Sequence, residues 1–278
     1  MEDMGVVDRM VILRGLILYT FCRKACIYNP VTRQSLTLPA NICAQPELRR
    51  HKTVNYFFGH DPVLDQYKIV CNVFEMWETS KFWVFVLEPG GFWKRIEDDD
   101  KPHNPSGRGL CINGVIYYLA YNNNASINLS INVVYCFDVR SEKLRVIQAP
   151  REVSPIGRRL SFIDHGGKPT LFDFTLIGET GVSELWVLED GLVGTWSRKS
   201  LVLKPCQRHL LDDIIVGWMM LHGTGQNNQV ILEFPHRCYL FCYDLIKNDL
   251  RKVNIIREST YMQIKLMDKC DSIMHLEI

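Results

Sequence analysis

The chain repeats one pattern of apolar and polar positions along most of its length. A short apolar run ends in an acidic or amide residue, passes through a polar turn and resumes as a second apolar run. No segment keeps the 3.6-residue apolar period of an amphipathic helix for 12 residues or more. Each copy is therefore a predicted β-hairpin. The five copies are residues 25–38, 82–96, 133–147, 185–199 and 238–253.

These hairpins recur at nearly constant spacing. The acidic or amide residues before the turns are Asn29, Glu88, Asp138, Glu189 and Asp244, which gives intervals of 59, 50, 51 and 55 residues. A further pair of strands precedes the hairpins. In the pair 110–112 and 115–119, the dipeptide Asn113-Gly114 favours the positive φ of a two-residue turn. Four strands in each period indicate the blade of a β-propeller.

We therefore expect an all-β, kelch-like β-propeller of about five to six four-stranded blades. An incomplete blade at the N-terminus stays open. A β-sandwich or a pair of barrels with similar strand spacing stays open. Residues 261–266 and 273–276 either add strands to a sixth blade or close the ring, because an open ring would leave exposed edges. Residues 11–278 are expected to form a single domain, after a short N-terminal segment, 1–10.

Composition narrows the classes of partner. Hydrophobic residues make up 47% of the chain and charged residues 23%, as in ordinary packed domains. The 32 basic side chains are balanced by 31 acidic ones, so no net field would hold a polyanion. The nearest basic cluster reads as a solvated face and consists of Arg158, Arg159, Lys199, Lys204 and Arg208. We expect no nucleic-acid partner.

The chain also lacks the signals of membranes and secretion. No stretch approaches the roughly 20 apolar residues of a membrane span, and the N-terminus does not read as a secretory signal. We expect an intracellular protein, cytoplasmic or nuclear, with no membrane partner. In a reducing compartment the cysteines of strand-like runs should behave as small buried hydrophobic residues. These are Cys71, Cys111, Cys136, Cys238 and Cys242.

The sequence offers no set of residues for chemistry. The pairs Cys22/Cys26 and Cys238/Cys242 have the wrong spacing for zinc and are expected in the core. The eight histidines are scattered, no G-x-S-x-G elbow is present, and the acidic run 97–100 lacks the spacing of a calcium loop. We therefore expect no enzyme and predict no catalytic residue, no cofactor and no metal. The six tryptophans should mostly pack between blades, although a loop-borne aromatic could anchor a partner.

Four segments carry a family resemblance. They are Asn29-Pro-Val-Thr-Arg-Gln34 closing on Leu38-Pro39, then residues 59–70, 112–120 and 136–144. In this order they resemble the motifs of plant F-box-associated domains, and above all the type 3 F-box-associated β-propeller. The resemblance covers most of the chain. It implies a protein-interaction domain similar to the target-binding part of SCF-type E3 ubiquitin ligase receptors, with an unknown target protein as partner.

One family feature is missing. The resemblance implies an N-terminal F-box, a helical module that docks onto a Skp1-like adaptor, but only about ten residues precede the first predicted strand. We expect no F-box, so for this chain the resemblance gives adaptor binding no support. A stand-alone, truncated propeller that binds targets without recruiting a ligase stays open as an alternative. A small-ligand-binding or enzymatic propeller, with its site in the central channel, is the third hypothesis.

Overall fold

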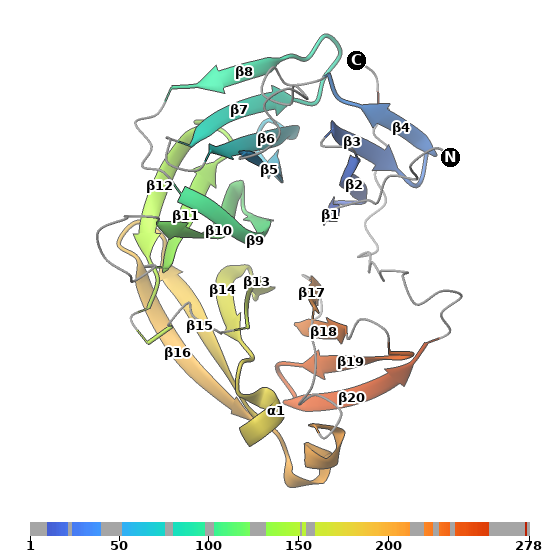
Figure 1. Cartoon of the computed structure of the whole chain (residues 1–278), viewed down its shortest axis with the longest axis vertical. Coiled ribbons are helices and arrows are strands. Elements are labelled where there is room, and N and C mark those ends of the chain that lie inside the picture. Colours follow the sequence, from blue (N-terminus) through green and yellow to red (C-terminus); the bar gives the residue numbers. More distant parts are fainter. Residues whose placement is uncertain are drawn as a thin grey trace. The chain divides into compact units, whose positions relative to one another are not determined.

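The computed structural model confirms an all-β chain (Figure 1). The residues that it describes are 10–21, 24–39, 52–75, 80–97, 103–122, 132–150, 152–153, 159–211, 220–224, 228–233, 237–255 and 276. They include twenty strands and two short helical segments, α1 (Ile177–Thr180) and a 3₁₀ turn at Pro205–Leu211.

The strands form five four-stranded antiparallel sheets, and in each sheet they pair in the order in which they follow one another along the chain. The bounds of the strands are β1 Met10–Leu13, β2 Leu16–Phe21, β3 Lys24–Asn29 and β4 Gln34–Thr37; β5 Lys52–Asp61, β6 Gln66–Glu75, β7 Lys81–Val86 and β8 Trp93–Ile96; β9 His103–Ile112, β10 Val115–Asn122, β11 Asn132–Asp138 and β12 Lys143–Gln148; β13 Leu160–His165, β14 Lys168–Asp173, β15 Val182–Asp190 and β16 Thr195–Val202; β17 Met220–Thr224, β18 Gln229–Glu233, β19 Tyr239–Asp244 and β20 Asp249–Asn254.

Each sheet is thus one blade of the predicted propeller. A consecutive, four-stranded antiparallel meander is the repeating unit of propeller folds. The described residues contain five such units, which is the lower end of the predicted count. The segment expected to add a sixth blade or close the ring lies outside the described residues, apart from Leu276. That residue is buried in the first unit, and its backbone N–H donates to Gln34 Oε1 over 3.0 Å.

Turn chemistry explains why the hairpins form where the sequence places them. At the end of β3 the side chain of Asn29 accepts a hydrogen bond from the backbone N–H of Val31, at 3.0 Å. Asp residues at the ends of β5, β11, β15 and β19 make the same kind of bond two or three residues ahead: Asp61 to Val63, Asp138 to Ser141, Asp190 to Leu192 and Asp244 to Ile246. Such a bond starts a turn without help from the rest of the fold.

Two details of these turns differ from the sequence-based prediction. In the fourth hairpin the turn begins at Asp190 and not at Glu189, because a bulge between Leu188 and Asp190 adds one residue to β15. In the second hairpin β8 begins at Trp93, and Phe92 lies exposed in the turn before it. The two-residue turn at Asn113-Gly114 is confirmed, with φ of 48° and 79°.

Contacts divide the described residues into two units. The first unit holds the sheets β1–β4, β5–β8 and β9–β12 together with Leu276, and the second holds β13–β16 and β17–β20. That residues 11–278 form one domain stays a prediction. Within the first unit β1 contacts β5 and β5 contacts β9, and within the second β13 contacts β17. The first strand of each sheet therefore lies beside the first strand of its neighbour.

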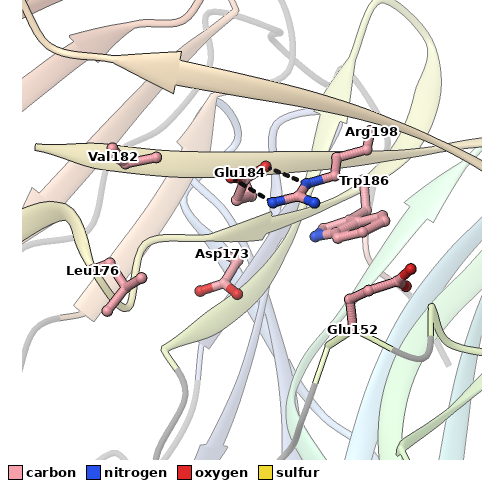
Figure 2. Close-up of a pocket in the computed structure, with 7 residues that line it drawn as sticks. All are labelled: Glu152, Asp173, Leu176, Val182, Glu184, Trp186 and Arg198. Atoms are coloured by element: carbon pink, nitrogen blue, oxygen red, sulfur yellow. Dashed lines mark hydrogen bonds and ion pairs between the residues drawn. The ribbon is translucent and has the colours of Figure 1, made fainter. Parts of the chain in front are cut away.

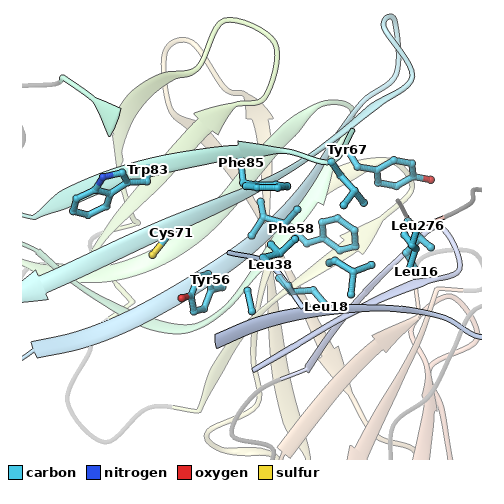
Figure 3. Packing of buried hydrophobic residues seen from close by; sticks show 14 of the residues in the cluster. Leu16, Leu18, Leu38, Tyr56, Phe58, Tyr67, Cys71, Trp83, Phe85 and Leu276 are labelled. Atoms are coloured by element: carbon cyan, nitrogen blue, oxygen red, sulfur yellow. The ribbon is translucent and has the colours of Figure 1, made fainter. Parts of the chain in front are cut away.

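Apolar faces between neighbouring sheets make the cores. In the first unit one cluster joins β2 and β3 to β5, β6 and β7 (Figure 3). A second cluster joins β5–β7 to β10 and β11. In the second unit a single cluster fills the space between the β13–β16 and β17–β20 sheets. Successive side chains along a strand point to opposite faces, so the two faces of a sheet bury different sets of side chains.

Close approach of strands explains one glycine of the sequence motifs. Gly59 lies on β5, where a Cβ atom would come within 2.6 Å of Val139 Cγ2 and 2.9 Å of Ile116 Cδ1. Both contacts come from the third sheet, so any side chain at this position would push the second and third sheets apart. The motif requires glycine here because of packing between sheets.

Among the described residues, no helix has the length and apolar character that crossing a membrane would demand.

Candidate recognition surface

Exposed apolar side chains lie at the tips of several turns. The pairs Val63/Leu64, after β5, and Leu192/Val193, after β15, project into solvent, and Leu192 and Val193 are 82% and 79% exposed. Phe92 and Ile246 are further exposed examples from the β7–β8 and β19–β20 turns. Isolated exposed apolar residues are normal on protein surfaces. Val63/Leu64, Leu192/Val193 and Ile246 follow a turn-starting Asp at the same offset, which gives these tips a fixed backbone and an apolar surface.

A network of ion pairs links the β11–β12 turn of the first unit to strands of the second sheet. Arg140, in the β11–β12 turn, donates from Nε to Asp61 Oδ2 over 3.1 Å and from Nη2 to Asp61 Oδ1 over 3.2 Å. In the same turn Glu142 accepts from Lys68 Nζ at 2.8 Å and from Lys94 Nζ at 2.9 Å. Lys68 and Glu142 are largely shielded, with side chains 6% and 17% exposed. These bonds tie the third sheet to the second.

The charge on Asp61 makes the first of these ties sensitive to acid. The hydrogen bonds from Arg140, helped by those from the turn backbone, lower the pKa of Asp61 to about 2. A group whose pKa is lower in the folded chain stabilises the fold at pH above its unfolded value, about 4, and that contribution is lost as the pH falls towards 2.

We therefore expect Asp61→Asn to remove part of the loss of stability between about pH 4 and pH 2. The amide oxygen of asparagine can still accept from the turn backbone, so the substitution removes the charge and leaves the turn bond. Urea unfolding midpoints measured from pH 7 to pH 2.5 test this. Glu97→Gln, at an exposed side chain directly after β8, is the control and should alter the profile less than Asp61→Asn does. Identical profiles for wild type and Asp61→Asn would contradict the prediction.

A pocket lies on one face of the β13–β16 sheet in the second unit (Figure 2). Its volume is about 140 Å3. The lining residues come from the connection before β13, from β14, from the start of α1 and from the two strands of the β15–β16 hairpin: Glu152, Asp173, Leu176, Val182, Glu184, Trp186 and Arg198. Strand register explains why they meet. Asp173 pairs with Glu184, and Trp186 pairs with Arg198, so all four side chains share one face.

Arg198 is held in place at the pocket wall. It donates from Nε to Glu184 Oε2 over 2.8 Å and from Nη2 to Glu184 Oε1 over 3.0 Å, and Ser200 Oγ donates to the same carboxylate. Its guanidinium carbon lies 5.2 Å from the centre of the Trp186 ring. A bidentate Arg–carboxylate pair fixes the orientation of the guanidinium as well as pairing its charge, so this wall of the pocket is preformed.

Trp186 brings an unused hydrogen-bond donor to the pocket. Its side chain is buried, at 6% exposure, yet its indole Nε1–H has no hydrogen-bond partner among the described residues. Figure 2 shows the nitrogen edge of the ring turned towards the Asp173 side of the pocket. Buried polar groups are nearly always paired in native proteins, so an unpaired donor in a pocket wall marks a place for an acceptor.

The cysteines are distributed differently from what the sequence indicates. Cys26, Cys71 and Cys136 are buried as expected. Cys238 is exposed and precedes β19, so the prediction that it lies in the core is wrong. Its partner in the expected pair, Cys242, is half-buried because it lies on the face of β19 away from the cluster that holds Phe241 and Tyr243. Cys111 is also half-buried, and Cys22 lies outside the described residues.

Two tryptophans and one histidine of the first unit serve packing. Trp83 and Trp93 belong to the cluster between the first two sheets, as predicted, whereas Trp77 and Trp218 lie outside the described residues. His103 is fully buried; its ring stacks on Tyr135 at 3.7 Å between centroids, and its Nε2 lies 3.1 Å from Tyr118 Oη. Within the described part of the chain, no three His, Cys, Asp or Glu side chains come together as a metal site would require.

Of the pocket residues, sequence reasoning singled out Trp186 alone, and for packing. The signal that could have found the others is strand alternation, since Glu184 and Trp186 are two residues apart on one predicted strand and Arg198 lies on its hairpin partner. Lys199, Lys204 and Arg208 are exposed, in agreement with the expected solvated face. Arg159 of the same predicted cluster is half-buried, and Arg158 lies outside the described residues.

Comparisons with known proteins agree on one protein family. A family model described as "F-box associated beta propeller domain" matches residues 1–276. The chain is 55% identical over 231 residues to an Arabidopsis thaliana protein provisionally named as F-box protein At5g62660, covering 80% of this chain and 58% of the relative. It is 40% identical over 295 residues to the F-box/LRR-repeat protein At2g40920 of the same plant, covering 96% of this chain and 66% of the relative. The chain thus spans less than two thirds of the length of these relatives.

Among solved structures, the chain is similar to a luciferin-regenerating enzyme. The TM-score is 0.52 with 8% sequence identity, over 91% of this chain and 78% of the other. At that identity the likeness concerns the fold alone.

Proposed function

The chain belongs to the F-box associated β-propeller family, and on that premise we propose that it binds a target protein as the recognition part of an SCF-type ubiquitin ligase receptor. The observation that carries the proposal is the set of exposed apolar turn tips, above all Leu192/Val193 and Val63/Leu64. Water is a poor environment for such side chains, and burying one completely stabilises a complex by about 1.5–3 kcal/mol.

The construction of the tips supports the same proposal. Asp190 and Asp61 each hold the backbone of their turn before any partner arrives. A preformed surface loses little conformational freedom on binding, so more of the contact energy appears as affinity. Propellers present such turns from a rigid scaffold, where binding residues are commonly found. The protein works inside the cell and without catalysis of its own in this proposal.

The test begins with a partner identified by cross-linking and affinity capture from plant cells, then purified and titrated by calorimetry. Leu192→Ser/Val193→Ser and Val63→Ser/Leu64→Ser are made separately. We expect at least one pair to weaken binding by about tenfold, which corresponds to about 1.4 kcal/mol. Val146→Ser and Val253→Ser remove exposed apolar side chains from strands and are the matched controls. Unchanged affinity in both pairs would contradict recognition through the tips.

The ligase role has its own measurement. The full-length protein is isolated from cells, and its association with a Skp1-like adaptor and the abundance of the captured target are measured with and without the gene. Adaptor association together with target accumulation in the knockout is the expected result. A protein that binds the target but never the adaptor would overturn the ligase role and leave target recognition standing.

A further inference from the structure

We propose that the pocket on the β13–β16 sheet binds a lysine or arginine side chain of a partner protein. The proposal deepens the recognition function proposed above and rests on it for the identity of the partner as a protein. It does not rest on it for the chemistry of the pocket, which follows from size, charge and one unpaired donor.

Size selects a single side chain. Sites for metabolites and drug-sized ligands usually enclose about 300–1,000 Å3. The pocket measures about 140 Å3, and a cavity of about 150 Å3 is known to hold a molecule as small as benzene. One amino-acid side chain fits such a volume, and a cofactor does not.

Charge selects a basic group. Three carboxylates, from Glu152, Asp173 and Glu184, face one guanidinium, from Arg198, so the lining has a formal charge of −2. Glu184 and Arg198 neutralise one another through their two-pronged hydrogen bond. The formal excess of acidic groups in the lining comes from Glu152 and from Asp173, which also accepts a hydrogen bond from the backbone of Thr175. It favours a cation and disfavours an acidic side chain or a phosphate.

The indole donor selects a peptide as the source of that cation. Leaving a buried N–H unpaired is unfavourable, so Trp186 Nε1–H gains from an incoming acceptor. The nearby carboxylates disfavour an anionic acceptor, which leaves a neutral oxygen. A backbone carbonyl beside a lysine or arginine supplies a neutral acceptor and a positive charge on one short segment, and the aliphatic stem of that side chain can lie along Leu176 and Val182.

The experiment follows the indole N–H directly. The purified chain, labelled with nitrogen-15, shows one indole resonance for each ordered tryptophan, and Trp186→Phe identifies the resonance of Trp186 by its loss. The probe is Nα-acetyl-lysine N-methylamide, whose ε-ammonium stays charged. Nα-acetyl-arginine N-methylamide is the second basic probe. N-acetyl-norleucine methylamide, which has a similar stem and no charge, is the control ligand. We expect a saturable shift of the Trp186 resonance with both basic probes and none with the control at the same concentrations.

Variants of the carboxylates test the charge. Asp173→Asn retains an oxygen for its bond to the backbone of Thr175, so the fold should survive, and Glu152→Gln lies at an exposed side chain. Each should weaken the lysine probe by about threefold to tenfold. Glu179→Gln makes the same change of charge on α1, outside the pocket, and should leave binding unchanged. No shift with any probe, an equal shift with norleucine, or equal loss in Glu179→Gln would overturn the proposal.

This result can be separated from the test of the function. If a captured partner binds equally well to wild type and to the double variant Glu152→Gln/Asp173→Asn, target recognition stands and its use of the pocket is wrong. If the indole resonance responds as expected and the turn-tip variants leave partner binding unchanged, the pocket stands and recognition through the tips is wrong.

Discussion

Replacing Phe172 with alanine should lower the free energy of unfolding by about 3–5 kcal/mol. Phe172, on β14, is fully buried in the cluster between the two sheets of the second unit. Its ring lies 5.6 Å from that of Phe174 and 6.3 Å from that of Tyr243, measured between centroids. Removing the ring leaves a cavity that strands fixed by their ladders cannot close, so the lost contacts are not replaced.

The measurement is thermal and urea unfolding, combined with amide hydrogen exchange that reports on each strand. A loss of that size should lower the midpoint of thermal unfolding by about 10 °C. Exchange should accelerate first in β14, β15, β18 and β19, because the cluster joins these strands. Leu192→Ala, at an exposed turn tip, is the control and should stay within about 0.5 kcal/mol of wild type. A loss below about 1 kcal/mol in Phe172→Ala would mean that these sheets do not enclose the ring.

Sequence alone predicts the blades well because their signals are local. An apolar run, a turn-starting Asp or Asn and a second run lie within about 15 residues of one another, and each turn is fixed by bonds inside that span. The sequence pattern marks Asn29 and Asp138 as the residues before two turns, and the side chain of each accepts a backbone hydrogen bond within its turn. The same logic fails by one residue at Asp190, since Glu189 and Asp190 are both acidic and only the bulge in β15 decides between them.

The pocket and the ion pairs could not be predicted in the same way. Glu152 and Arg198 are 46 residues apart in the sequence and face one space only because the connection before β13 returns to the β15–β16 hairpin. Asp61 meets Arg140 across 79 positions. No local rule joins such residues, because their pairing depends on which face of each strand is turned to the next sheet. That choice is made by packing, as Gly59 against Val139 illustrates.

Among the ion pairs between the second and third sheets, the loss of Lys68–Glu142 should lower the free energy of unfolding most. Lys68→Met removes the ammonium and retains an apolar stem, which leaves the largely shielded Glu142 carboxylate with Lys94 alone. Removing one partner of a buried ion pair costs about 3–5 kcal/mol when the other charge is left uncompensated. Because Lys94 still contacts Glu142, we expect a smaller cost, about 1–3 kcal/mol, measured by urea unfolding at pH 7.

A second substitution decides whether that cost comes from the stranded charge or from lost packing. Burial acts to raise the pKa of Glu142, but the hydrogen bonds and charges of Lys68 and Lys94 together lower this pKa below its ordinary value. The carboxylate therefore stabilises the fold at pH above its ordinary pKa, and this contribution is lost as the pH falls through the lowered pKa. If the charge is the cause, Glu142→Gln added to Lys68→Met should restore part of the stability, with a coupling energy of about 0.5–3 kcal/mol in the double-mutant cycle. Lys94→Met, at an exposed ammonium, should cost less than Lys68→Met. Strictly additive losses for Lys68 and Glu142 would show that the two side chains stabilise the sheets independently, through their stems and not through their charges.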